Sequence, residues 1–78
     1  MFYVYVIKSL KDNTRYKGHC QNLHVRLKQH NQGKVKSTKG RLPWRLEYWE
    51  TFDTREEVIS REKYLKSGVG REWLNSIL

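Results

Sequence analysis

An arginine and a histidine stand four residues apart in a segment that has the pattern of a helix, residues 23 to 31. On such a helix Arg26 and His30 emerge on the same side, beside the apolar stripe. Arginine suits a bidentate grip on phosphate oxygens, and histidine moves protons near neutral pH. Both properties serve phosphodiester cleavage. Taken alone, the pair is more typical of two exposed polar residues.

A glutamate occupies an apolar position in the next predicted helix. Glu62 falls between Val58 and Leu65, in the i, i+4, i+7 register of the buried stripe. Burying an unpaired carboxylate is costly, so the side chain requires a neighbouring cation or a bound metal ion. Arg61 or Lys63 reaching round would supply the cation. Periodicity alone favours this salt bridge over the metal.

Three tyrosines lie on two strands that are expected to pair. Alternation places Tyr3 and Tyr5 on one face of the first strand, and Tyr16 lies on the second. Packing in the core or on the sheet is the simplest interpretation of each. A tyrosinate is, however, a strong enough base to take a proton from water, and a nearby Arg26 would lower the tyrosine pKa from about 10.

The elements that position these side chains follow from local patterns. Phe2 to Ile7 are β-branched or aromatic throughout, as in a central strand buried on both faces. Residues 11 to 13 indicate a turn, and Thr14 to Gly18 are predicted to return as an antiparallel strand. Asn22 can cap the first helix, and Gly33 can end it.

The second half of the chain predicts a loop, a strand and two helices. Lys34 to Pro43 shows no periodicity and is expected to be a mobile basic loop. Trp44 to Phe52 is strand-like, and Thr54 with a glutamate three residues later forms a capping box for a helix. Gly68 and Gly70 are expected to interrupt the chain before a last helix, Arg71 to Leu78. This helix should turn three side chains inward: Trp73, Leu74 and Ile77.

Length and composition bound the architecture. With 78 residues, 37% of them hydrophobic, the chain can bury one small core, so we expect a single domain over residues 1–78. The predicted class is α+β: a three-stranded antiparallel sheet flanked by helices, in the order β-β-α-β-α-α. No heptad or exposed apolar stripe marks an interface, so a monomer is expected.

The sequence argues against a membrane-spanning or secreted protein, against a disulfide and against a zinc site. The longest apolar stretch, Phe2 to Ile7, is too short to span a bilayer, and no secretory signal precedes it, so a cytoplasmic protein is expected. Cys20 alone allows no internal disulfide. Its neighbours His19 and His24 lie too close to it for a recognised zinc spacing.

The charge of the chain is lopsided. The formal net charge is +8; residues 1–46 hold eleven Lys and Arg against one acid, whereas residues 47–78 hold five against seven. A basic half attracts a polyanion, so nucleic acid is the expected partner, ahead of an anionic membrane. Loop side chains are expected to contact phosphates without reading bases, and these are Lys34, Lys36, Lys39 and Arg41.

Two tripeptides carry a resemblance to a known family. Tyr3-Val4-Tyr5 and, after ten intervening residues, Tyr16-Lys17-Gly18 resemble the paired motifs of the GIY-YIG nucleases. The succession that follows is also similar: Asn22-Leu23, Arg26-Leu27, His30-Asn31, Gly33, Thr38-Lys39, Pro43-Trp44, Leu46, Glu50, Arg61-Glu62-Lys63 and Leu65-Lys66. The first tripeptide departs from the family in lacking its leading glycine, and the second has Lys17 in place of an aliphatic residue.

The resemblance is strongest to the small stand-alone branch related to the cleavage domain of the bacterial excision-repair nuclease subunit. It implies catalytic roles for four residues, Tyr5, Tyr16, Arg26 and His30. It implies that Glu62 holds one Mg²⁺ or Mn²⁺ ion as its only direct protein ligand. His19 follows the second glycine, where the related branch carries a lysine that helps hold the site, and is a secondary candidate for contact with the nucleic acid. Which tyrosine is the base is left open.

The function implied is a metal-dependent DNA endonuclease, acting in DNA repair or recombination, with a protein partner as one way to target it. One alternative is a DNA-binding module with a decayed nuclease site. Another is a structure-selective or RNA-directed factor in which Trp44 or Trp49 stacks on unpaired bases. The sequence favours a core position for both tryptophans.

Overall fold

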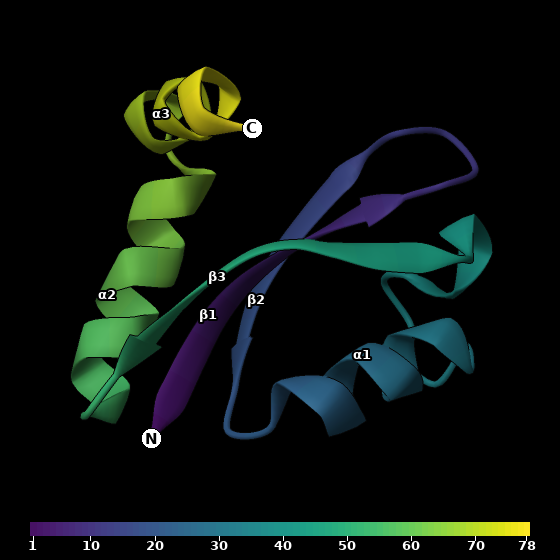
Figure 1. The fold of residues 1–78 in the computed structure, drawn as a ribbon, viewed down its shortest axis with the longest axis horizontal. Coiled ribbons are helices and arrows are strands. Elements are labelled where there is room, and N and C mark those ends of the chain that lie inside the picture. The colour runs from purple at the N-terminus through teal and green to yellow at the C-terminus, as the bar shows by residue number, and fades with distance from the viewer.

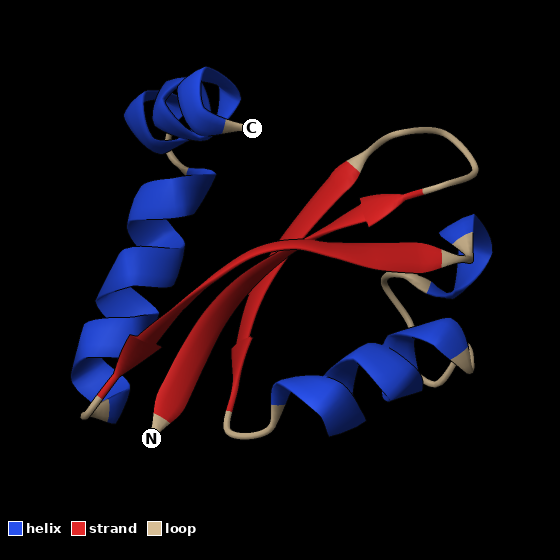
Figure 2. Ribbon diagram, in the orientation of Figure 1, coloured by secondary structure: helices blue, strands red, loops and turns tan.

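The protein folds around a three-stranded antiparallel sheet with strand order β2-β1-β3, flanked by three helices (Figures 1 and 2). The computed structural model describes all 78 residues. The elements in chain order are β1 (Phe2–Ser9), β2 (Arg15–Cys20), α1 (Leu23–Asn31), the 3-10 turn η1 (Lys39–Arg41), β3 (Trp44–Phe52), α2 (Arg55–Lys66) and α3 (Gly68–Ile77). The predicted α+β architecture and element order are confirmed.

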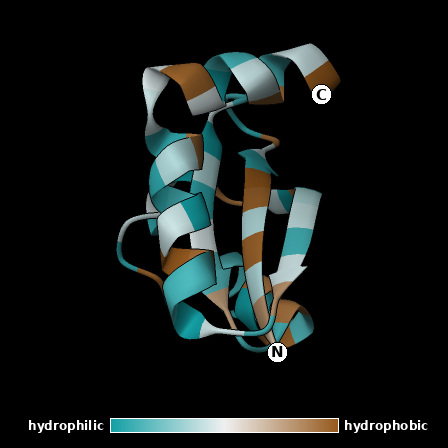
Figure 3. Ribbon diagram, turned by 90° about the vertical axis from the view of Figure 1, so that its left-hand side faces the viewer, coloured by the Kyte–Doolittle hydropathy of each residue, from teal (hydrophilic) through white to brown (hydrophobic).

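The central strand β1 separates two small cores, because its buried side chains alternate between the faces of the sheet. Val4 and Val6 pack with Val58 and Leu65 of α2 and with Leu74 of α3. Figure 1 shows α2 and α3 on one side of the sheet and α1 on the other, and in Figure 3 the hydrophobic colour is dense along the strand that starts at the N-terminus. Burial of β1 on both faces is therefore confirmed.

The second core lies under α1. It is built on Tyr5, Ile7 and Trp44, with Leu23 and Leu27 of α1 packed against it. The helix begins as predicted, since the Asn22 side chain accepts a hydrogen bond from the Val25 backbone N–H. It is followed by a glycine with positive φ, Gly33 at 73°.

The start of the last helix differs from the prediction. The helix α3 begins at Gly68, and the Ser67 side chain caps it by accepting from the Gly70 N–H. The two glycines therefore belong to its first turn. A Cβ on Gly70 would lie 1.9 Å from the Tyr64 carbonyl oxygen, so the glycine permits the tight approach of α3 to α2. Leu74 is buried as expected, but Ile77 is 46% exposed because it lies at the free end of the helix.

Two other segments are more structured than predicted. The strand β2 extends to Cys20, since it pairs with β1 as far as Tyr3↔Cys20. The predicted irregular loop after α1 contains η1 and the fully buried Thr38. It is tied to the body of the protein, because Trp44 Nε1 donates to the Thr38 carbonyl oxygen over 3.0 Å.

Candidate active site

A buried hydrogen-bonded chain joins β1, α1 and the segment after α1. The Tyr5 hydroxyl lies 2.8 Å from His30 Nε2, and His30 Nδ1 lies 2.7 Å from Thr38 Oγ1. Tyr5 is 2% exposed, and His30 and Thr38 are fully buried. The sequence placed His30 on a surface shared with Arg26; instead it is held inside the protein by partners 25 residues before it and 8 after it.

The directions of these hydrogen bonds follow from which groups can donate. Arg26 Nε, 3.4 Å from the Tyr5 hydroxyl, is a donor only. The buried hydroxyl must therefore give its own proton to His30 Nε2. The ring proton of His30 then lies on Nδ1 and is donated to Thr38, whose hydroxyl has the Val35 carbonyl oxygen 3.4 Å away as its acceptor. Thr38 thus sets the tautomer of His30.

Burial decides the charge states of Tyr5 and His30 in this hydrogen-bonded chain. Burial raises the pKa of Tyr5 to about 12, against the lowering effect of Arg26. Burial, followed by the positive charge of Arg26, lowers the pKa of His30 to about 4. Both side chains are neutral at pH 7. Arg26 does lower the Tyr5 pKa, as expected, but desolvation outweighs the arginine, so the expected net fall of this pKa below 10 is wrong.

Arg26 lies at the solvent-facing end of the hydrogen-bonded chain, next to Tyr5. It is half-buried, and its Nη1 donates to the Gln29 side chain over 3.1 Å. No carboxylate lies within 4.0 Å of its guanidinium. The charge of Arg26 is therefore available to an external anion.

The second tyrosine differs from the first. The Tyr16 ring packs edge-on against His30, with ring centroids 5.3 Å apart. Its hydroxyl has no hydrogen-bond partner in the protein, yet no buried polar atom is left unpaired, so solvent reaches it. Gly18 lies between the two tyrosines, and a Cβ there would be 2.6 Å from the Tyr5 hydroxyl oxygen and 3.3 Å from Tyr16 Cε2. Only glycine fits beside this pair.

Glu62 lies on the other face of the sheet. Its Oε1 is 2.6 Å from His19 Nδ1 on β2, and its Oε2 accepts from Lys66 over 2.8 Å. Burial works to raise the pKa of Glu62, but the hydrogen bonds from Lys66 and His19 outweigh burial and hold the pKa below its ordinary value. The sequence predicted Arg61 or Lys63 as its partner. Arg61 instead binds Glu50 through two hydrogen bonds, because their strand and helix are adjacent.

The edge strand β2 joins the two groups of side chains. Successive residues of a strand point to opposite faces, so Gly18 lies against Tyr5 while His19 reaches Glu62. The structure therefore brings together Tyr5, Tyr16, Arg26 and His30 on the α1 face. It places His19 and Glu62 on the α2 face of the same strand.

The surroundings of Glu62 fit a single-carboxylate metal site. A carboxylate has about four acceptor positions, and His19 and Lys66 use two of those on Glu62. Mg²⁺ keeps several waters and binds proteins through one or two carboxylates. No group of three or more His, Cys, Asp and Glu side chains is arranged to hold a metal ion. A metal here would have Glu62 as its carboxylate ligand.

The four basic residues predicted to contact phosphate do not join either group. Lys34, Lys36 and Lys39 are exposed. Arg41 is also exposed and lies 3.4 Å from Asp12. They remain candidates for phosphate contact at the surface.

The two tryptophans of β3 have opposite environments. Trp44 is 4% exposed and belongs to the core, as predicted. Trp49 is 53% exposed, so its predicted core position is wrong. It lines a shallow hollow with Tyr3 and the start of α1. Because α1 begins only at Leu23, beside this hollow, the helix leaves Trp49 uncovered.

Sequence patterns missed two positioning residues. Thr38 holds His30, and Asn31 clamps Trp44 by accepting from its backbone N–H over 2.6 Å and donating to its carbonyl oxygen over 3.0 Å. The sequence signal that could have found them was their place in the motif succession, in the pairs Thr38-Lys39 and His30-Asn31.

None of the three helices is long and apolar enough to cross a bilayer.

Residues 1–75 match the family model described as the GIY-YIG catalytic domain. A UPF0213 protein from Clostridium perfringens is 46% identical over 67 residues, which cover 85% of this chain and 71% of that protein. The UPF0213 protein YazA from Bacillus subtilis is 45% identical over 65 residues, covering 82% of this chain and 65% of YazA. Both relatives extend beyond the matched segment.

A solved structure has the same fold. The solution NMR structure of a UPF0213 protein from Bacillus halodurans superposes with a TM-score of 0.59 at 36% sequence identity, covering 99% of this chain and 85% of that one. The shared sheet and helices are those that hold the two groups of side chains described above.

Proposed function

The chain belongs to the GIY-YIG family, alongside the UPF0213 proteins, and on that premise we propose that it is a metal-dependent DNA endonuclease that hydrolyses phosphodiester bonds. The observation that carries the proposal is the gathering of four side chains around Gly18 of β2, while the next residue of that strand, His19, binds the Glu62 carboxylate of α2. These four are Tyr5, Tyr16, Arg26 and His30. We place the activity in the cytoplasm and in DNA repair or recombination.

Arg26 and Tyr16 are the two groups that an incoming phosphate and water can reach. Arg26 has no acidic partner, so its guanidinium would bind the phosphate oxygens and stabilise the charge that builds on them. The solvent-reached hydroxyl of Tyr16, in its deprotonated form, would take the proton of the attacking water. As the water oxygen bonds to phosphorus, the bond from phosphorus to one flanking sugar oxygen breaks.

Tyr5 and His30 have the role of positioning residues in this scheme. The Tyr5 hydroxyl accepts from Arg26 and donates to His30, so it fixes the guanidinium against the sheet. With pKa values of about 12 and about 4, both stay neutral at pH 7 and add no charge beside Arg26. This assignment separates the two tyrosines by environment, a distinction that the motif spacing leaves open.

Glu62 would hold the metal ion, Mg²⁺ or Mn²⁺. When bound, such an ion polarises a phosphate oxygen and helps neutralise the leaving oxygen. The hydrogen bonds from His19 and Lys66 keep Glu62 charged and orient its carboxylate toward β2. His19 is thereby a positioning residue for the metal ligand.

The exposed Trp49 favours a substrate that contains unpaired bases. Its indole is 53% exposed on the α1 face, directly opposite Tyr5 in the β1–β3 register. Stacking on an exposed aromatic face holds single-stranded DNA or RNA without sequence preference. We propose that branched, nicked or single-stranded DNA is preferred over intact duplex.

The decisive experiment compares wild type with Glu62→Gln and with Glu56→Gln. The second variant makes the same change on an exposed residue of the same helix. Each protein is incubated with labelled single-stranded, duplex and branched DNA in Mg²⁺, in Mn²⁺ or in EDTA, and products are sized on a denaturing gel. We expect metal-dependent cleavage by wild type and Glu56→Gln, and none by Glu62→Gln.

Binding of the same DNA is measured in parallel by fluorescence anisotropy. Cleavage by Glu62→Gln at the wild-type rate would overturn the metal assignment. Binding without cleavage by any of the three proteins would instead support the binding module with a decayed site.

A further inference from the structure

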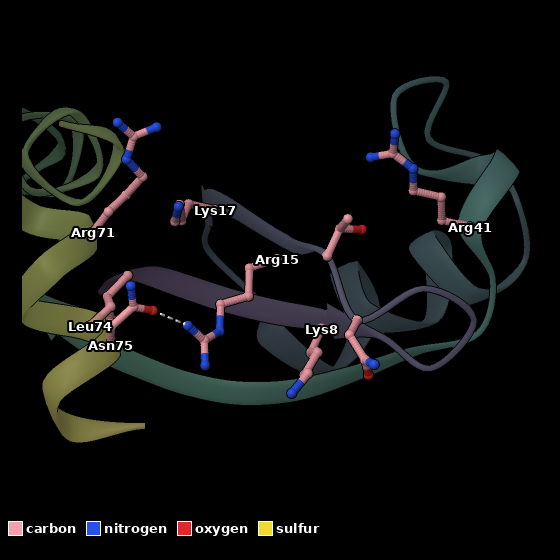
Figure 4. A pocket seen from close by; sticks show the side chains of 9 residues that line it. Lys8, Arg15, Lys17, Arg41, Arg71, Leu74 and Asn75 are labelled. Atoms are coloured by element: carbon pink, nitrogen blue, oxygen red, sulfur yellow. Dashed lines mark hydrogen bonds between the residues drawn. The ribbon is translucent and has the colours of Figure 1, made fainter. Parts of the chain in front are cut away.

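A basic hollow of about 570 Å³ lies at the end of the sheet where α3 approaches the β1–β2 hairpin. It is lined by Lys8, Asn13, Thr14, Arg15, Lys17, Arg41, Arg71, Leu74 and Asn75. In Figure 4 the side chains of Arg71 and Arg41 stand at opposite ends, with Lys17, Arg15 and Lys8 between them. Five of the nine lining residues are cationic and none is acidic, so the hollow has the charge of an anion site.

Most of this charge is not neutralised by the protein. Arg15 donates to Glu47 over 2.8 Å, and Arg41 lies 3.4 Å from Asp12. The other three cations, Lys8, Lys17 and Arg71, have no carboxylate within 4.0 Å. A surface that serves only solubility has positively and negatively charged side chains mixed together. Here three positive charges share one concavity.

The cations of the hollow act on one another. Burial and then the charges of Arg71, Arg15 and Lys66 lower the pKa of Lys17. The Lys17 side chain is half-buried among like charges. A bound anion would relieve this repulsion, because opposite charge favours the ionised lysine.

Neutral donors complete the lining. Asn75 accepts from Arg15 Nη1 through its side-chain oxygen over 2.6 Å (Figure 4). Its amide nitrogen is therefore the free end of the side chain, and it is a donor. Arginine guanidinium groups, with neutral N–H donors between them, can donate hydrogen bonds to the oxygens of phosphate groups.

The hollow and the Glu62 group are neighbours along β2, because Lys17 lines the hollow and His19 binds Glu62. Lys17 and His19 are two residues apart on one strand, so both face α2 with Cα atoms about 6.6 Å apart. His19 binds Glu62, and Lys66, which also binds Glu62, is close enough to act on the Lys17 pKa. A phosphate chain lying in the hollow would run directly to the carboxylate proposed to hold the metal.

We propose that this hollow binds the phosphate backbone of the DNA substrate beyond the cleaved bond, and that Lys17 and Arg71 are its main contacts. The inference rests on the proposed endonuclease function and adds the path of the strand, along the α2 side of β2 toward α3. The sequence assigned backbone contact to the loop after α1. Of those loop residues, only Arg41 lines the hollow.

The test uses binding in EDTA, where no cleavage interferes. Affinity for a labelled single-stranded oligonucleotide is measured by fluorescence anisotropy across a range of salt for Lys17→Gln/Arg71→Gln. The matched control is Arg55→Gln/Lys63→Gln, which removes the same charge from exposed positions of α2. We expect the hollow variant to bind at least about tenfold more weakly at low salt. Its slope of log affinity against log salt should be less steep by about 1.4, as for two lost phosphate contacts.

A charge-preserving variant, Lys17→Arg/Arg71→Lys, is expected to bind within about threefold of wild type, since phosphate attraction follows net charge. Equal affinity of the hollow variant and the control variant would overturn the proposal. Competition separates a strand from a small anion. Displacement of the oligonucleotide by equimolar inorganic phosphate at constant ionic strength would mean that the hollow is a small-anion site, and would overturn the strand assignment.

The outcome is independent of whether the chain cuts DNA. If wild type binds through the hollow but no substrate is cleaved, the endonuclease function fails and the hollow remains a backbone site. If cleavage depends on Glu62 while the hollow variant binds like the control, the function stands and this inference fails.

Discussion

The two faces of the sheet hold their functional side chains by different physics. On the α1 face, Tyr5, His30 and Thr38 form a buried chain in which each polar atom has a specific partner. On the α2 face, cations gather in an open hollow, and several of them have no acidic partner.

This contrast separates positioning from attraction. Removing any one member of a buried hydrogen-bonded chain destabilises the fold strongly, because it leaves a desolvated polar group unpaired. An open basic surface changes gradually, since each charge adds a screened contribution. Substitutions on the α1 face should therefore change stability, and those in the hollow should change binding.

The largest effect is expected for His30→Ala. It opens a cavity and leaves the Tyr5 and Thr38 hydroxyls without their partner, so the free energy of unfolding should fall by about 3 to 5 kcal/mol. Urea unfolding followed by tryptophan fluorescence measures it. His24→Ala is the control, because His24 is exposed on the same helix, and it should change stability by less than about 0.5 kcal/mol. Similar losses for both variants would contradict the buried chain.

The pH dependence of the free energy of unfolding should reveal the burial of His30 without mutation. The folded-state pKa of His30 is about 4, below its ordinary 6.5, so the unfolded chain binds more protons between these values. Stability should be complete above pH 6.5 and fall by about 3 kcal/mol as the pH drops from 6.5 to 4. The lowered carboxylate pKa values of Glu50 and Glu62 act only below 4.5. Urea midpoints at pH 7 and pH 5 test this, and His30→Gln should flatten the difference.

A smaller loss is expected for Gly18→Ala. Its Cβ would lie 2.6 Å from the hydroxyl oxygen of Tyr5, which cannot swing away without leaving His30 and Arg26. Overpacking of this kind costs about 1 to 3 kcal/mol. Gly40→Ala is matched, since nothing lies within 4 Å of its added Cβ. Thermal unfolding of the two variants compares them, and an unchanged Gly18→Ala would show that the tyrosine is loosely held.

The smallest effect on stability belongs to the hollow. Lys17→Gln should leave the free energy of unfolding within about 0.5 kcal/mol of wild type, because the lost charge has no acidic partner and is repelled by Arg71 and Arg15. Thermal unfolding at low salt checks this. A loss above about 1 kcal/mol would mean that the lysine is a structural residue and would blur the contrast between the faces.

The sequence predicted those features that neighbouring residues control. The β-branched and aromatic run of β1 marks a strand buried on both faces, and Asn22 caps α1. The capping box of α2 forms as expected, with Thr54 and Glu57 bonded to each other's backbone. Capping and periodicity depend on contacts within one turn or one strand, so a local pattern is enough to specify them.

The tertiary structure decided the features that join distant segments. The hydrogen bond between Tyr5 and His30 spans 25 residues, and that between His19 and Glu62 spans 43. The exposure of Trp49 depends on where α1 begins over the sheet, and the early start of α3 depends on how closely Gly70 approaches α2.

By itself, then, the sequence determined the order of the elements, the residue types that could act on a phosphodiester and the excess of positive charge. It did not determine that His30 is neutral and buried, that Glu62 pairs with His19 and Lys66, or that Lys17 and Arg71 share one hollow. Burial and pairing between distant residues are set by which faces pack together. A pKa follows from that packing rather than from the residue type.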